Sequence, residues 1–352
     1  MKKTVYLIFI AFIMNIILTR ALLSQNSIET FPYDYYGFNE NYYSCHGIKI
    51  EPHLSKATVY YILEPRKCED VNRNLVIFIP GWPVMVTDVY YFWLEHLVKR
   101  GNVVLFAPYL PFRNSQRYTD IVYSITKDAF DTLKRKKVNF NNIAITGHSS
   151  GGAIAMNIAS RLSNNDLYPP VKVIMPVEPG NGSYIKNNHL IPLATGFNLE
   201  NLNNFNENTL LLIILGSSSS DDYLTNALNI YDSTINIPSE NKNILMFNTT
   251  KNGNYELRAN HFFPTSWGFI PGIGIGSKNL PFIFSFIDIV DMNFDLFHVD
   301  ILDYKLWYLF DALMDAAFYN DRREDALGGT YRQTFIGYWP DGSEIERLTL
   351  IK

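Results

Sequence analysis

Residues 143–152 read Ile-Ala-Ile-Thr-Gly-His-Ser-Ser-Gly-Gly. An apolar run ends here in a glycine-bounded turn, so the pattern predicts a buried strand, a sharp turn and the start of a helix. Ser149 stands at the centre of a G-x-S-x-G pattern, and a Cβ at Gly147 or Gly151 would crowd such a turn. The stretch therefore predicts that Ser149 is held above the sheet edge, where its hydroxyl could act as a nucleophile.

Apolar runs alternate with helically spaced segments on both sides of this turn. Unbroken apolar strands indicate burial on both faces, and strands that alternate with helices indicate βαβ units. The sequence therefore predicts an α/β fold with a mostly parallel central sheet and helices on both faces. The expected strands are 58–63, 74–79, 102–107, 142–146, 171–175, 210–215 and 244–247, and the expected helices are 90–99, 119–134, 150–162 and 300–318.

Length and charge limit the class of protein. The chain has 352 residues, of which 47% are hydrophobic, so it can bury a large core. Its formal net charge is −4, and the absence of a long basic run in the sequence argues against a nucleic-acid partner. We expect residues 25–352 to form one domain, in which the aromatic and glycine-rich stretch 262–297 is a loop or lid.

The N-terminus has the pattern of an export signal. Lys2 and Lys3 precede an apolar run from Val5 to Leu18. This run is shorter than the roughly 20 residues of a membrane-spanning helix, and a basic start favours a signal peptide. We expect residues 1–24 to be a signal peptide and the protein to be secreted or periplasmic. An uncleaved signal anchor, with membrane association through this segment, stays open.

The two cysteines, Cys45 and Cys68, both follow the expected signal. In an oxidising compartment, two cysteines in one exported chain favour a disulfide. The alternative is two separate thiols. Neither cysteine belongs to a metal-ligand pattern, and the sequence implies no metal or organic cofactor.

A nucleophilic serine needs a base, and in this architecture the expected order is serine, acid, histidine. His261 follows the last predicted strand by a short loop, where the base should lie. His298 is the alternative, but it precedes the C-terminal helix and has no such strand before it. We therefore expect His261 to be the base.

The acid should follow an earlier strand end. Asp221 and Asp222 come after the strand 210–215, at the entry to a helix. Asp221 is favoured, because it would lie at the mouth of that loop, and Asp222 is the second choice. Glu178 is the competitor, since it directly follows the strand 171–175.

Two backbone N–H groups should stabilise the oxyanion that forms when the serine attacks a carbonyl. One is the N–H of Ser150, directly after the nucleophile. The other should come from Pro80-Gly-Trp-Pro83, after an apolar strand. Pro83 has no N–H, so Trp82 is the expected donor, and a cis Trp82-Pro83 bond would help to point this N–H inward.

These motifs together resemble the α/β-hydrolase family over about residues 58–318. The stretch 147–152 is similar to the nucleophile turn of lipases, esterases and chlorophyllase-like enzymes. Pro80-Gly-Trp-Pro83 is similar to the H-G-x-P oxyanion motif, with Pro80 in place of its histidine. The stretches 260–264, 304–313 and 336–342 resemble exported bacterial α/β-hydrolases. The resemblance implies Ser149 as nucleophile, His261 as base and an aspartate of the 221–222 pair as acid.

The expected function is hydrolysis of carboxylic esters through an acyl-enzyme, with a small-molecule or lipid ester as substrate. Two other functions fit the same fold. One is a catalytically silent binding protein, and the other is a membrane-associated lipid acyltransferase. Fold alone does not choose among them.

Overall fold

The computed structural model describes residues 36, 38, 42–56, 58–68, 73–109, 117–165, 167–180, 198–266 and 299–352. The expected signal at 1–24, most of the expected loop at 262–297, and His298 lie outside these ranges. None of the described helices is long and apolar enough to cross a membrane.

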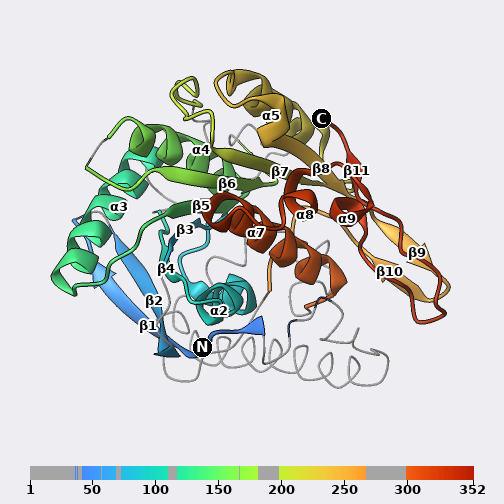
Figure 1. Ribbon diagram of the computed structural model, residues 1–352, viewed down its shortest axis with the longest axis horizontal. Helices are drawn as coiled ribbons and strands as arrows, with labels where there is room; N and C mark the ends of the chain where they lie inside the picture. Colours follow the sequence, from blue (N-terminus) through green and yellow to red (C-terminus); the bar gives the residue numbers. More distant parts are fainter. Residues whose placement is uncertain are drawn as a thin grey trace, which may run out of the picture.

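A nine-stranded sheet runs through the described part of the chain, in the order β1-β2-β4-β3-β5-β6-β7-β8-β11 (Figure 1). The neighbours from β4 to β8 are parallel, whereas β1, β2 and β11 join at the two edges in antiparallel register. This confirms the expected α/β class. The strands are β1 (Cys45–Leu54), β2 (Val59–Cys68), β3 (Leu75–Ile79), β4 (Val103–Phe106), β5 (Ile143–His148), β6 (Val171–Val177), β7 (Leu210–Gly216), β8 (Lys242–Phe247) and β11 (Thr349–Leu350).

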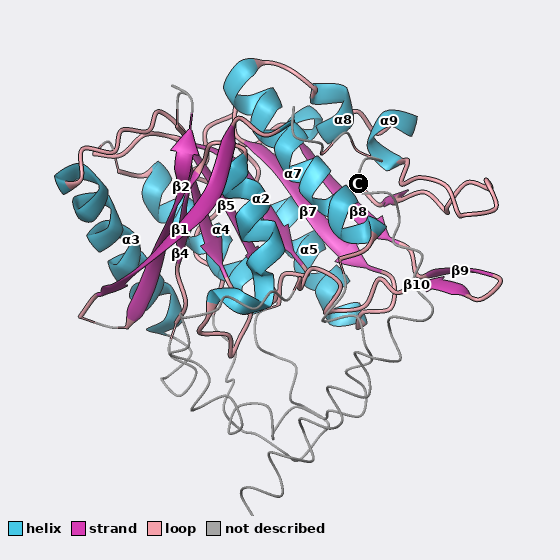
Figure 2. Cartoon of the chain, turned by 90° about the horizontal axis from the view of Figure 1, so that it is seen from below, coloured by secondary structure: helices cyan, strands magenta, loops and turns pink. Residues whose placement is uncertain are grey.

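Helices cover both faces of this sheet (Figures 1 and 2). Side chains alternate along a strand, so Val76 and Phe78 of β3 enter one core cluster while Ile77 enters the other. The first cluster includes α2 (Tyr91–Lys99) and α7 (Ile301–Tyr319). The second includes α3 (Tyr118–Arg135), α4 (Ser150–Ser163) and α5 (Asp221–Ser233).

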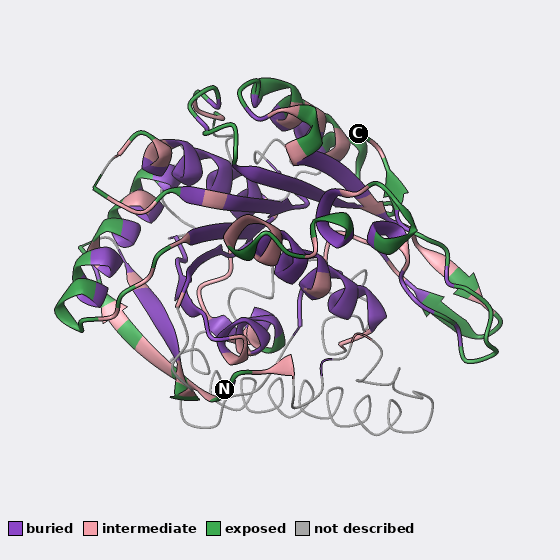
Figure 3. Cartoon of the chain, viewed as in Figure 1, coloured by how far each residue is buried: buried purple, intermediate pink, exposed green. Residues whose placement is uncertain are grey.

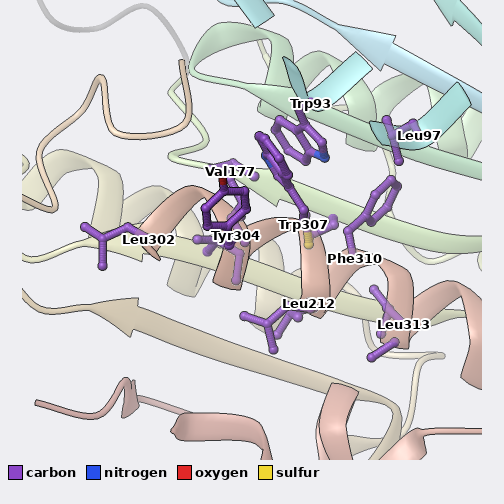
Figure 4. Packing of buried hydrophobic residues seen from close by; sticks show 14 of the residues in the cluster. Trp93, Leu97, Val177, Leu212, Leu302, Tyr304, Trp307, Phe310 and Leu313 are labelled. Atoms are coloured by element: carbon purple, nitrogen blue, oxygen red, sulfur yellow. The ribbon is translucent and has the colours of Figure 1, made fainter. Parts of the chain in front are cut away.

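Helix α7 is the main cover of one face. Asp300 caps it in a capping box with Asp303, and Asn320 ends it in the left-handed region. Its buried side chains pack between α2 and β7 (Figure 4). The residues that meet there are Trp93 and Leu97 of α2, Leu212 of β7, and Leu302, Trp307, Phe310 and Leu313 of α7.

The edge hairpin β1–β2 carries the disulfide. Cys45 and Cys68 face each other in the antiparallel register, and their sulfur atoms are bonded. This confirms the expected pairing. The sequence analysis did not predict β1, because most of its residues are half-buried or exposed and they form no apolar run.

The C-terminal region differs from expectation. The sequence pattern of residues 328–342 predicts a short strand and a turn. The turn is present, because the Gly342 N–H donates to the Trp339 carbonyl at 2.9 Å, but no strand forms in this stretch. Helix α9 (Tyr331–Thr334) lies in this stretch, directly after α8 (Arg323–Leu327), and a single bridge joins Tyr338 to Glu344. The buried Gln333 amide explains the helix, because its oxygen accepts from the Gly329 N–H and from Asn243 of β8.

A second, small sheet projects from the body. It pairs β9 (Thr250–Asn252) with β10 (Tyr255–Leu257), and its tip is exposed (Figure 3). Short 3-10 turns at Thr87–Tyr90 and Ser239–Asn241 complete the described elements. The chain then returns from β10 toward the carboxyl ends of the parallel strands, where the site lies.

Candidate active site

Ser149 lies on the turn between β5 and α4 in a backbone conformation that L-residues rarely adopt, with φ 59° and ψ −131°. Such a conformation costs about 1–3 kcal/mol and persists only where the surroundings enforce it. Here the Ser149 N–H donates to the Val177 carbonyl at 2.9 Å. A Cβ on Gly147 would overlap the Gly151 backbone, and one on Gly151 would overlap the carbonyls of β3 and its following loop. The two glycines are therefore required by the turn, as predicted.

His261 follows β10 and turns its ring toward this serine. Its Nε2 lies 3.0 Å from Ser149 Oγ. Burial lowers the pKa of His261 to about 3, so the ring is neutral at ordinary pH. A neutral ring with an unprotonated Nε2 accepts the serine proton, which is the geometry of a general base.

Glu178 completes the arrangement at the carboxyl end of β6. Its Oε2 lies 3.4 Å from His261 Nδ1, and its Oε1 accepts the Gly216 N–H at the end of β7. Glu178 also has a positive φ, 49°, a backbone conformation that is uncommon for residues other than glycine. The carboxyl group is fully buried, and this burial raises the pKa of Glu178 to about 8, although the Gly216 N–H and the nearby Ser219 hydroxyl oppose the shift.

The turn, the histidine and the acid thus meet at the carboxyl ends of the parallel strands, where open α/β sheets place their sites. A family model described as lipase (class 3) matches residues 85–186. The chain has the α/β-hydrolase fold. The match contains the Ser149 turn and Glu178, and it supports a lipid ester hydrolase in general terms. No curated protein matches the chain.

The position of the acid in this α/β-hydrolase corrects the expectation from sequence. Asp221 and Asp222 are exposed in the first turn of α5, and neither has a hydrogen bond to His261 in the described structure. Four residues separate Asp221 from the end of β7, and both aspartates are exposed to solvent, whereas Tyr223 of the same helix packs on His261. Acids at a helix N-terminus are favoured by the helix dipole, which explains the pair without a role in the site.

Helix α5 does contribute one side chain, which the sequence pattern did not single out. Tyr223 stacks on His261 with ring centroids 4.5 Å apart and an interplanar angle of 13°. Its hydroxyl lies 3.2 Å from His261 Nε2. In the sequence Tyr223 looks like an ordinary apolar helix residue, and only the packing of α5 against the base loop reveals it.

The expected oxyanion donors are the backbone N–H groups of Ser150 and Trp82. Ser150 opens α4, so its N–H has no acceptor within the helix. The Trp82 N–H donates to Ser150 Oγ at 3.2 Å, and the Trp82-Pro83 bond is cis, as expected. Tyr109 OH lies 2.6 Å from the same Ser150 Oγ. Both expected donor groups therefore belong to residues beside the nucleophile.

The described residues contain no group of three or more His, Cys, Asp or Glu side chains placed to hold a metal ion. The polar atoms around Ser149 instead form serine–histidine and histidine–carboxylate contacts, which suit acyl transfer.

Proposed function

We propose that this α/β-hydrolase is a serine hydrolase of carboxylic esters, with Ser149 as nucleophile, His261 as base and Glu178 as the acid. One observation carries the proposal: Ser149 Oγ, His261 and Glu178 form a continuous line of polar contacts, at 3.0 Å and 3.4 Å. Such a line is recognised by geometry and not by residue order or spacing.

In the proposed reaction, Ser149 Oγ attacks the ester carbonyl carbon while its proton moves to His261 Nε2. The ionised Glu178 then stabilises the imidazolium through Nδ1. Collapse of the tetrahedral intermediate breaks the bond to the alcohol, which leaves with the proton from Nε2. Water then takes the place of the alcohol, gives a proton to His261 Nε2 and attacks the acyl carbonyl carbon. Collapse of the second tetrahedral intermediate returns the proton to Ser149 Oγ and releases the carboxylic acid.

The N–H groups of Ser150 and Trp82 are the proposed oxyanion donors. The Trp82 N–H is engaged by the Ser150 hydroxyl, so the substrate oxygen has to take over this donor as it binds. The lipase (class 3) match supports a lipid ester as the substrate class.

A fluorophosphonate probe and a p-nitrophenyl ester series test the proposal. The wild type should be labelled and should hydrolyse the esters, whereas Ser149→Ala should lose both properties. Ser218→Ala is the matched control, because Ser218 is exposed and its hydroxyl bonds to the hydroxyl of Thr249 and not to His261 or Ser149. Labelling that survives in Ser149→Ala would refute the proposed nucleophile.

We further propose that the enzyme works outside the cytoplasm. The basic and apolar N-terminal sequence and the Cys45–Cys68 disulfide support this location. N-terminal sequencing of the chain from the medium and from membranes tests it. A chain that begins near residue 25 is expected, and an intact N-terminus in the cytoplasmic fraction would contradict the proposal.

A further inference from the structure

Three buried groups link the loop before Trp82 to the backbone of the base loop. The Gly81 N–H donates to Tyr90 OH at 3.1 Å. Tyr90 OH lies 2.8 Å from His148 Nδ1, and His148 Nε2 lies 2.7 Å from the His261 carbonyl oxygen. Tyr90 and His148 are only 1% and 3% exposed, so water does not compete for these contacts.

The direction of each hydrogen bond follows from the chemistry of its atoms. The His261 carbonyl can only accept, so His148 Nε2 carries a proton and donates. Burial, and the neighbouring His261 ring, hold the pKa of His148 well below its usual range, so His148 is neutral and its Nδ1 accepts. Tyr90 therefore donates its hydroxyl proton to Nδ1, and its oxygen accepts the Gly81 N–H.

We propose that Tyr90 and His148 are positioning residues that fix the oxyanion loop and the base loop relative to each other. This chain of bonds, which we call the relay, connects Gly81 to the backbone of His261, two residues that are far apart in the sequence. The proposal rests on the hydrolase function proposed above.

The sequence of the oxyanion loop supports this inference. Pro80 stands where the H-G-x-P motif has histidine, and proline has no side-chain donor or acceptor with which to hold the loop. Tyr90, the residue before α2, supplies an acceptor for the Gly81 N–H of this loop. A Cβ on Gly81 would meet Ser149, His148 and Tyr90 at 3.1–3.3 Å, so the loop backbone is packed directly against the nucleophile and the relay.

The consequence for catalysis lies in the transition state. The Trp82 N–H and the His261 ring act on the charge that develops in the transition state, so a small displacement of either group weakens its interaction there. Misplacement by about 1 Å can cost about 100-fold in rate. Loss of the relay should therefore lower kcat and leave KM nearly unchanged. A purely structural role would instead lower the amount of folded enzyme without this split.

Tyr90→Phe is the direct test, because it removes one oxygen and leaves the ring packed against Phe78 and Phe106. We expect kcat for a p-nitrophenyl ester to fall about 10- to 100-fold, with KM within twofold. Tyr60→Phe is the matched control, since Tyr60 is equally buried but bonds to Asp128 and Thr132 of α3. A Tyr90→Phe enzyme with wild-type kcat would overturn the proposal.

A double-mutant cycle tests whether the two residues act as one chain. His148→Gln keeps an amide donor for the His261 carbonyl but replaces the ring Nδ1 that accepts from Tyr90 with an amide oxygen at a different position. If the relay is one unit, Tyr90→Phe combined with His148→Gln should lose little more than the worse single variant. Fully additive losses in kcat would mean that the residues act separately and would refute the coupling.

The proton positions can be measured without any activity. In protein with 15N-labelled histidine, the ring nitrogen shifts of His148 should show a neutral ring with its proton on Nε2 from pH 5 to 8. Tyr90→Phe should shift Nδ1 toward the value of a nitrogen without a hydrogen bond. A charged ring, or a proton on Nδ1, would overturn the relay. Absence of Ser149-dependent labelling would refute only the proposed function.

Discussion

Glu178 has to meet two opposing demands. It must be ionised to stabilise the His261 imidazolium, yet burial disfavours the charge and raises the pKa of Glu178 to about 8. The Gly216 N–H donates to Oε1 and offsets part of this cost. The positive φ of Glu178 adds backbone strain, as does that of Ser149. Ser149 and Glu178, which follow the adjacent strands β5 and β6, thus both have a strained backbone in the site.

The first prediction concerns the identity of the acid. Glu178→Gln should lower kcat about 10³- to 10⁴-fold, because an amide N–H facing Nδ1 would favour the wrong tautomer of His261. Asp221→Asn and Asp222→Asn are matched controls that each remove an exposed carboxylate from α5, and both should keep kcat within about twofold. Steady-state kinetics of all three variants on one ester identifies the acid. A larger loss in Asp221→Asn than in Glu178→Gln would restore the assignment from sequence.

The second prediction concerns the pH dependence of kcat/KM, which reports on the free enzyme. The active form has neutral His261 and ionised Glu178. The pKa of His261 is lowered to about 3, and that of Glu178 is raised to about 8, so removal of the proton from Glu178 is the last step toward the active form as pH rises. The rate should therefore rise toward a plateau above about pH 8. If kcat/KM instead rises to its plateau at or below pH 6.5, ionisation of Glu178 does not control the pH dependence.

At the scale of elements, the turn after β5 is built by backbone contact and not by side chains. The Ser149 carbonyl accepts the N–H groups of Gly152 and Gly180, at 2.9 Å and 3.0 Å. The same turn touches the ends of β3 and β6, because Gly151 lies against β3 and Val177 accepts the Ser149 N–H. Three neighbouring strand ends are thereby locked around the nucleophile.

The third prediction follows from this close contact. Gly151→Ala would force a Cβ against the carbonyls of Ile79 and Pro80, and overpacking of this kind typically costs about 1–3 kcal/mol of unfolding free energy, or more. Gly253→Ala is the control: it has a positive φ of 59°, but no atom lies within 4 Å of its added Cβ. Urea unfolding should show the larger loss for Gly151→Ala. Equal losses would show that the contact with β3 and its following loop does not make glycine necessary at position 151.

Much of this arrangement could be predicted from the sequence, because its signals are local. Apolar runs marked every parallel strand of the sheet, and the glycine spacing marked the turn. The acid could not be resolved in this way. Glu178 and Asp221 both follow strands, and only the path of the chain after β7 decides which carboxyl group reaches His261. Tyr90, His148 and Tyr223 likewise act through contacts between distant segments, which no local pattern records.

On the scale of the whole molecule, the site lies where the two core layers meet at one end of the sheet. Tyr90 and α2 belong to the layer that contains α7, whereas Tyr223 and α5 belong to the opposite layer. His261 follows β10, stacks on Tyr223 of one layer and contacts His148, which bonds to Tyr90 of the other layer. Both halves of the core therefore have to be packed before the base, the acid and the oxyanion loop are in place, which links activity to global folding.

The last prediction joins the buried acid to global stability. The pKa of Glu178 is raised from an ordinary 4.5 to about 8, so between these pH values the folded state holds a proton that the unfolded state has lost. The sign of linkage is then that unfolding free energy falls as pH rises through this window. Glu178→Gln carries no charge and escapes the loss. It should match the wild type below pH 4.5 and exceed it by a few kcal/mol at pH 8, since one pKa unit is about 1.4 kcal/mol.

Asp222→Asn, at an exposed site, should differ from the wild type by no more than about 0.5 kcal/mol at any pH. Urea unfolding from pH 4 to 9 measures all three proteins. A difference in stability between Glu178→Gln and the wild type that does not grow with pH would show that the pKa of Glu178 is not raised in the folded protein.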